Sequence, residues 1–233
     1  MNLSTLPHCG RLFAIGIALA VTAGCSSLLP KPAEPPVFYT LDLARPAAQP
    51  VNPPSLPAPD APILVVTPPH AAAGFDSNRI VYTHELHQLE YFARSEWIDT
   101  PARMLSPLIV SVLGGGSAFR AVLATPSAAA GDIKLDTEIV RLQQDFSASP
   151  SRVRFTLRAA FVETRTRRVL AWREFDESVV AASEDPAGGV EAANRAVRQV
   201  LQALTALCTE AVANWTPVGK IPCEGCSTAP ANR

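Results

Sequence analysis

The chain has 233 residues and carries 20 lysines and arginines against 21 acidic residues, which gives a formal net charge of −1. The sequence contains no block of basic residues, so we expect no nucleic-acid partner. After an N-terminal leader and a proline-rich spacer, roughly 170 residues remain, enough for one domain with a substantial hydrophobic core.

The first 24 residues are typical of a secretory signal peptide. Arg11 precedes an apolar run from Leu12 to Val21, which is too short to be a permanent membrane-spanning helix. Small residues then lead directly to Cys25, and this pattern resembles the lipobox of bacterial lipoproteins. The sequence therefore predicts cleavage before Cys25 and attachment of lipid to its sulfur. Thr22 departs from the usual leucine, so an incidental cysteine after an ordinary signal peptide is the alternative.

Residues 25–36 are predicted to form a proline-rich tether. Eleven of the 22 prolines lie between Ser26 and Pro62, and proline-rich segments act as extended, semi-rigid spacers that here span about 30 Å up to Pro36. Ser26 follows the lipidation site, and the aspartate that retains lipoproteins in the inner membrane of enteric bacteria is absent. By that analogy we expect the periplasmic face of the outer membrane.

Residues 37–216 are predicted to form an α+β domain with a second proline-rich loop at 46–62. Alternating or continuous apolar residues indicate strands at 37–43, 63–67, 80–83, 88–92, 119–124, 133–146, 152–161 and 169–180. A shift of parity near Val140 predicts a β-bulge. A helix is expected from Thr100, as N-cap, to Leu113, and a second from Val190 to Trp215. The expected fold is a mostly antiparallel sheet with two helices on one face.

Residues 217–233 form a tail with a Cys-x-x-Cys motif. Cys223 and Cys226 are the cysteines of this motif, and Cys208 lies in the last predicted helix. The motif does not begin a helix after a strand, as redox folds require, so redox catalysis is not favoured. Either a small loop closed within the tail or a disulfide between the tail and Cys208 is predicted.

No catalytic, cofactor or metal site is predicted. The run His84-Glu85-Leu86-His87 is one residue too short for the zinc-protease motif, so solvated histidines of a hairpin are favoured. No phosphate-binding glycine loop that ends in Lys-Ser or Lys-Thr is present, and neither is a Gly-x-Ser-x-Gly motif.

Three arginines form the candidate partner-docking site. Arg152, Arg154 and Arg158 share one face of a predicted strand, where they could contact an acidic partner or lipid headgroups. The alternative is a solvated sheet face in which they pair across the hairpin with Glu174 and Glu177.

The order of these segments resembles the family of ABC-type transport auxiliary lipoproteins. The matching features follow a lipobox and span nearly the whole mature chain: the strand Phe38–Asp42, the segment Asp76–Tyr82, Leu89–Phe92 followed by Trp97, the helix with Met104, the hairpin Thr164–Ala171 leading to Phe175, and an alanine-rich closing helix. The proline-rich loop from Pro46 to Pro62 and the cysteine-containing tail depart from the pattern.

The resemblance implies an accessory role without enzymatic activity. Such lipoproteins serve transporters in which an MCE-domain periplasmic protein works with an ABC permease and ATPase to move phospholipid or other hydrophobic cargo between membranes. This subunit would then dock the conduit at the outer membrane, as a ring of copies in one arrangement. The alternatives are a structural envelope lipoprotein without a transport role and, less favoured, a periplasmic hydrolase or redox protein.

Overall fold

The structure is a computed structural model in which residues 34–43, 57–127 and 130–216 are described. The predicted signal peptide, Cys25 and the Cys-x-x-Cys tail lie outside these residues. The chain divides into two units, Met1–Pro35 and Pro36–Arg233, and every element described below belongs to the second unit.

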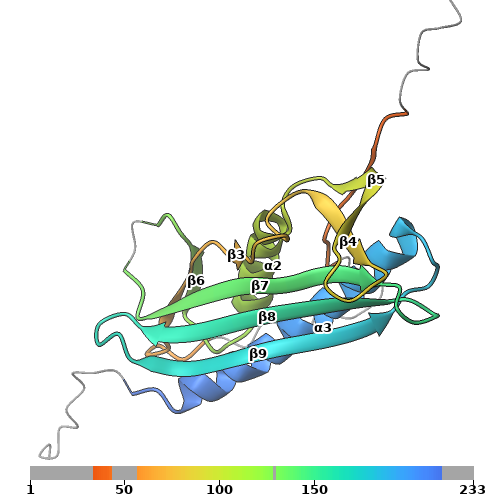
Figure 1. Cartoon of the computed structure of the whole chain (residues 1–233). Helices are drawn as coiled ribbons and strands as arrows, with labels where there is room; N and C mark the ends of the chain where they lie inside the picture. The colour runs from red at the N-terminus through yellow and green to blue at the C-terminus, as the bar shows by residue number, and fades with distance from the viewer. Residues whose placement is uncertain (1–33, 44–56, 128–129, 217–233) are drawn as a thin grey trace, which may run out of the picture. The chain divides into compact units, whose positions relative to one another are not determined.

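A mixed, mostly antiparallel sheet forms one layer of this unit (Figure 1). Its nine strands in the described residues are β1 (Val37–Tyr39), β2 (Ile63–Val66), β3 (His70–Ala71), β4 (Arg79–Thr83), β5 (Glu90–Trp97), β6 (Ala121–Ala124), β7 (Ile133–Asp145), β8 (Arg152–Glu163) and β9 (Val169–Val180). The long strands β7, β8 and β9 form an antiparallel meander. The predicted α+β class is confirmed.

Strand β7 organises the sheet because it is long enough to pair with several short strands. On one side it pairs with β8 along its whole length. On its other side β2, β3 and β4 follow one another, all parallel to it, with Leu64 opposite Ile133, His70 opposite Glu138 and Val81 opposite Gln143. The predicted bulge is confirmed, since the register with β8 shifts between Ile139 and Arg141.

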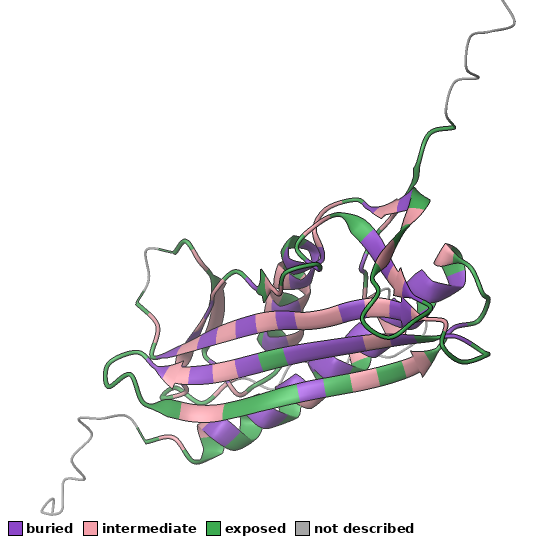
Figure 2. Cartoon of the chain, viewed as in Figure 1, coloured by how far each residue is buried: buried purple, intermediate pink, exposed green. Residues whose placement is uncertain are grey.

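Strand β8 supplies the centre of the core. Alternate side chains of this strand are almost fully buried (Figure 2), among them Phe155, Leu157 and Phe161. The side chains between them face solvent on the opposite side of the sheet, as the alternation of apolar and polar residues predicts.

Two helices pack against the sheet in the described residues, α2 (Pro101–Gly114) and α3 (Pro186–Ala213). Helix α3 contacts β8 and β9, while α2 contacts β2, β3 and β6. The predicted stripe of α3 is buried, including Val197, Leu201 and Leu204. The prediction of two helices on one face is confirmed.

Several boundaries differ from the predicted ones. Helix α3 begins at Pro186 rather than Val190, because the side chain of Asp185 accepts a hydrogen bond from the Gly188 N–H (2.8 Å) and caps the helix. Thr100 takes the extended conformation of an N-cap, but its side chain makes no capping bond. Strand β1 ends at Tyr39, four residues before the predicted end, and β5 continues to Trp97, beyond the predicted Phe92.

Candidate functional site

The segment that follows β1 is fixed to both helices. Asn194 of α3 accepts a hydrogen bond from the Asp42 N–H (2.7 Å) and donates one to the Thr40 carbonyl (3.2 Å). Leu41 is buried between them, and its N–H contacts the sulfur of Met104 on α2 at 3.5 Å. The segment that leaves β1 is therefore attached to the helix layer. We call this segment, Thr40–Asp42, the joint.

The three predicted docking arginines lie on the outer face of β8. Arg154 forms an ion pair with Asp176 (3.0 Å), and Arg158 pairs with both Glu174 (2.7 Å) and Glu138 (3.3 Å). Arg152 is exposed at the start of the strand, opposite Asp145 and Val180. The structure thus brings the arginines together and surrounds two of them with carboxylates.

These ion pairs shift the pKa values of the side chains that form them. The hydrogen bonds that Arg158 donates to Glu174 and Glu138 raise the pKa of its guanidinium. Partial burial raises the pKa of Asp176, but hydrogen bonds from Thr156 (2.6 Å) and Arg154 outweigh this and lower the pKa overall. Glu177 lies opposite Phe155, on the inward-facing register of the hairpin, so Asp176 takes the role that the sequence suggested for Glu177.

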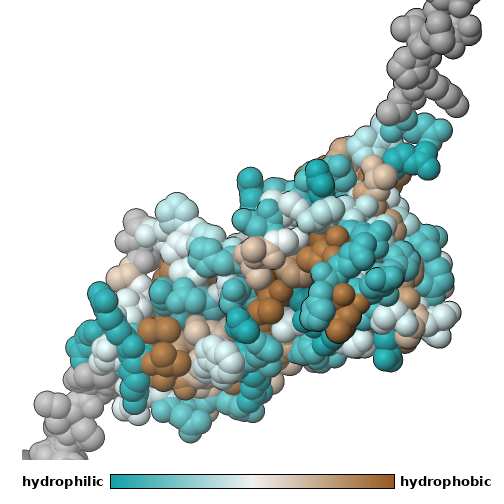
Figure 3. Space-filling model, viewed as in Figure 1, coloured by the Kyte–Doolittle hydropathy of each residue, from teal (hydrophilic) through white to brown (hydrophobic). Residues whose placement is uncertain are grey.

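The outer face of β7–β9 is balanced in charge rather than cationic. Its basic side chains are Lys134, Arg141, Arg152, Arg154 and Arg158, and its acidic side chains are Asp136, Glu138, Asp145, Glu174 and Asp176. Figure 3 shows hydrophilic residues over much of this face, with smaller hydrophobic areas between them. Such a lattice of opposite charges can fix the orientation of a partner, but it attracts no partner by net charge.

A groove crosses this face where β8 carries alanine. Ala160 lies opposite Trp172 of β9, whose side chain is exposed by 60%. The groove has a volume of about 360 Å³ and is also lined by His70, Glu138 and Arg158. Tryptophan and arginine are among the residue types enriched at the energetic centres of protein interfaces.

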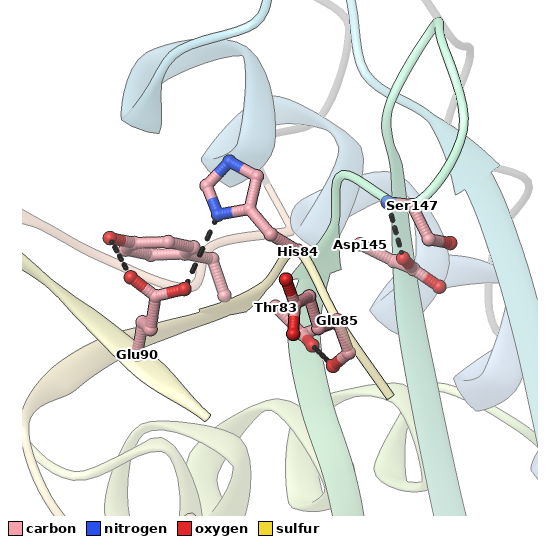
Figure 4. Close-up of polar contacts among 7 residues, drawn as sticks. Thr83, His84, Glu85, Glu90, Asp145 and Ser147 are labelled. Carbon is pink, nitrogen blue, oxygen red and sulfur yellow. Dashed lines mark hydrogen bonds and ion pairs between the residues drawn. The ribbon is translucent and has the colours of Figure 1, made fainter. Parts of the chain in front are cut away.

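The histidines of the His84-Glu85-Leu86-His87 run take separate roles in the turn after β4. The Nδ1 of His84 lies 3.3 Å from Oε1 of Glu90, and Oε2 of Glu90 accepts a hydrogen bond from the Tyr82 hydroxyl at 2.9 Å (Figure 4). The His84 ring stacks on Phe146, with centroids 5.1 Å apart. His87 adopts a positive φ of 67° in the same turn. His84 therefore belongs to an aromatic cluster that closes one end of the sheet.

Within the described residues, no group of three or more histidine, cysteine, aspartate or glutamate side chains is placed to hold a metal ion. In the same part of the chain, neither helix combines the length and the hydrophobicity that crossing a bilayer requires.

Cys208 is a free thiol with 1% of its surface exposed, and burial raises its pKa to about 12. Cys25, Cys223 and Cys226 lie outside the described residues. Lipidation of Cys25 and disulfide formation by the tail therefore stay predictions.

Glu163 is a buried carboxylate that sequence reasoning missed. Its oxygens accept hydrogen bonds from Thr166 and from the Trp215 indole N–H (3.0 Å), and the Arg168 guanidinium lies 3.8 Å away. The Thr166 hydrogen bond is the largest cause of the lowered pKa of Glu163. The alternation of β8 contained a signal, because Glu163 occupies the inward position that follows Phe161.

The fold is similar to those of solved bacterial proteins. A crystal structure from Xanthomonas campestris, of a protein with the family-model name DUF330, is 23% identical and covers 75% of this chain and 96% of its own, with a TM-score of 0.62. A second crystal structure, of an uncharacterized protein, is 13% identical, covers 74% and 98%, and has a TM-score of 0.56. The TM-scores show that the chain shares its α+β fold with these two proteins. No curated protein sequence matches the chain.

The family itself is shown by a sequence match over most of the domain. Residues 39–205 match the family described as the ABC-type transport auxiliary lipoprotein component. This span runs from the end of β1 into the second half of α3. The chain belongs to this family, as its resemblance predicted, and its general role is that of an auxiliary lipoprotein of ABC-type transport.

Proposed function

We propose that the protein is a non-catalytic, lipid-anchored accessory subunit of an intermembrane transporter for phospholipid or other hydrophobic cargo. Its partners would be an MCE-domain periplasmic protein, an ABC permease and an ATPase, and ATP hydrolysis would occur in the ATPase. The observation that carries this proposal is the family match over residues 39–205, which covers the sheet meander and most of α3. The alternative is a structural envelope lipoprotein without a transport role, which is favoured if the lipidated wild-type chain recovers no MCE-domain protein.

The anchor in this proposal is lipid on Cys25, at the periplasmic face of the outer membrane. Lipid chains on one residue give stable attachment when more than one chain is present. The tether of residues 25–36 leads into β1, and the joint then ties the chain to Asn194 and Met104. This arrangement suits a domain that is held at a membrane while a partner binds elsewhere on it.

The outer face of β7–β9 is the surface that we assign to the partner. Arg154 and Arg158 would exchange part of their contacts with Asp176, Glu174 and Glu138 for contacts with the partner. The exposed Arg152 would contact the partner directly, and Trp172 would enter an apolar pocket of it. Strand β9 is paired only with β8 among the described strands, so its free edge offers a second contact through which copies of the chain could form a ring.

Charge reversal on the outer face tests this assignment. The variant Arg154→Glu/Arg158→Glu places like charges beside Asp176, Glu174 and Glu138, so we expect recovery of the MCE-domain protein with the lipidated chain to fall by at least tenfold. Arg103→Glu on α2 is the matched control, because its side chain is exposed by 77% and pairs only within its own turn, with Asp99. Unchanged recovery with the double variant, at unchanged melting temperature, would remove this surface from the proposal.

A further inference from the structure

Three large apolar side chains are exposed beside one another where the domain begins. Val37 is exposed by 53%, Phe38 by 54% and Ile98 by 62%. Strand β1 pairs in parallel with β5, with Phe38 opposite Glu96, and the Ile98 N–H donates to the Tyr39 carbonyl at 2.7 Å. Phe38 and Ile98, which we call the β1 patch, therefore belong to two neighbouring chain segments (Figure 1).

The alternation of the two strands directs much of this patch outward. Tyr39 packs against the core and Trp97 is 3% exposed. Since successive side chains of a strand point to opposite faces, Phe38 and Ile98 project away from the core together, whereas Val37 lies on the face of Tyr39. Single exposed apolar side chains are ordinary, but an aromatic and an aliphatic side chain exposed on the same face of two neighbouring segments form an apolar surface whose removal from water is favourable.

The charges around the β1 patch are already compensated within the domain. Glu96 accepts a hydrogen bond from the Asn78 amide (2.8 Å), and Asp99 pairs with Arg103 (3.2 Å). Among the described residues, Arg79 lies opposite Glu96 in the register of β4 and β5, so Arg79 and Arg103 stand beside the two carboxylates. An occupant would therefore be held through apolar contact and would bind with little dependence on salt.

The chain before the patch identifies this occupant. Only eleven residues separate Cys25 from Val37, so a lipid on Cys25 keeps the patch within about 30 Å of the membrane surface. Tethering makes the second contact intramolecular, and a weak apolar patch then engages at a high effective concentration. We propose that the β1 patch inserts into the interface of the membrane that carries the anchor and thereby sets the orientation of the domain. This inference rests on the proposed lipidation.

The test uses the full lipidated chain in vesicles of phosphatidylethanolamine and phosphatidylglycerol that contain nitroxide-labelled lipid. A fluorescent label is placed on Ile98→Cys in a Cys223→Ser/Cys226→Ser background, where the buried Cys208 stays unlabelled. Val169→Cys is the matched control, because Val169 is exposed by 58% and begins β9 at the other end of the sheet (Figure 1). We expect quenching at position 98 to exceed that at position 169 by at least threefold, in low and high salt alike.

Phe38→Ser provides a second test in the same chain. Phe38 is half exposed and lies outside the core, so this neutral change is expected to leave the domain folded and to abolish the excess quenching at position 98. Vesicle flotation distinguishes failure of the membrane contact at the β1 patch from failure of the lipid anchor. A lipidated chain that floats with the vesicles but is quenched equally at both positions overturns the membrane contact alone. A chain that does not float overturns the proposed anchor and this inference together.

Discussion

Glu163 shows how a single buried carboxylate can tie the end of a helix to a sheet. It is 3% exposed, yet hydrogen bonds from Thr166 and Trp215 satisfy its oxygens. Burying a charge is tolerated only when such partners replace water. Because Trp215 follows α3 directly, Glu163 fixes the C-terminal end of that helix against the end of β8.

Glu163→Gln is expected to lower the melting temperature at neutral pH. The pKa of Glu163 is lowered in the folded state, so its stabilising effect is full above the unfolded-state pKa and is lost as pH falls through the folded-state pKa. Wild type and variant should therefore differ at pH 7, and the difference should shrink as pH falls below the ordinary glutamate pKa of about 4.3. Thermal unfolding across this range measures the difference. A gap that stays constant down to pH 3 would contradict this role.

Gly189 permits a close approach between α3 and the sheet. A Cβ at this position would lie 2.1 Å from the side-chain oxygen of Gln144. The Gln144 side chain is held in place, since the residue is 2% exposed and its amide nitrogen donates to the Ser151 hydroxyl at 2.9 Å. Such a contact is far shorter than any real Cβ contact, so Gln144 or the first turn of α3 has to move.

Gly189→Ala should destabilise the domain by about 1–3 kcal/mol, as overpacking does in a well-packed core. Gly114→Ala is the control, because the Cβ there would meet Val122 at an ordinary 3.9 Å, and it should be neutral or slightly stabilising. Urea unfolding gives both free energies. In a Gln144→Ala background the cost of Gly189→Ala should shrink, and an unchanged cost would show that the Gln144 contact is not its cause.

At the scale of elements, α3 is held by polar groups at both ends and near its first turns. Asp185 caps its N-terminus, Glu184 accepts from the Ser151 N–H (2.8 Å), and Asn194 binds the joint. The pKa values of Glu184 and Asp185 are lowered, chiefly by hydrogen bonds from Ser151 and from the Gly188 N–H respectively. Helix α3 therefore links the sheet, the joint and the end of the domain.

Asn194→Ala removes both hydrogen bonds to the joint and should cost about 1–2 kcal/mol. Hydrogen exchange is the direct measurement, since segments with few stabilising contacts open locally. We expect protection to fall at residues 37–42 and to persist in β8. Equal loss of protection in β8 would mean that the joint is part of the global folding unit and not a separately attached segment.

An element can be predicted from the sequence when the pattern that determines it is local. The alternation of β8 and the parity shift at Val140 are local, and the sequence predicted both. The start of α3 was missed because Gly188 and Gly189 weaken the helical pattern there. The structure explains these glycines, because a Cβ would collide with Ser183 at position 188 and with Gln144 at position 189. The parallel pairing of β2, β3 and β4 with β7 depends on distant segments, so no local pattern carries it.

The candidate sites divide in the same way. The common face of Arg152, Arg154 and Arg158 follows from strand parity and was predicted. Their neutralisation by Asp176, Glu174 and Glu138 depends on the register of three strands and was only partly visible in the sequence. The joint and the exposure of Ile98 come from the end of β1 at Tyr39, where packing on Met104 and Asn194 replaces further strand pairing.

At the scale of the whole molecule, the family of the domain is established and its lipid anchor on Cys25 is proposed. The domain belongs to the auxiliary lipoproteins of ABC-type transport. We propose that its joint, its outer sheet face and the β1 patch serve the tether, a partner and the membrane respectively. This division requires that lipid on Cys25, and not the fold itself, hold the protein at the membrane.

The most direct test is cell fractionation of Cys25→Ala, together with measurement of cargo transport between the two membranes. We predict that the wild-type chain is found in the outer-membrane fraction. The variant should be exported and folded, with an unchanged melting temperature, but released into the soluble periplasmic fraction and inactive in transport. A Cys25→Ala chain that stays in the outer membrane, or that supports full transport from the periplasm, would contradict the anchored accessory role.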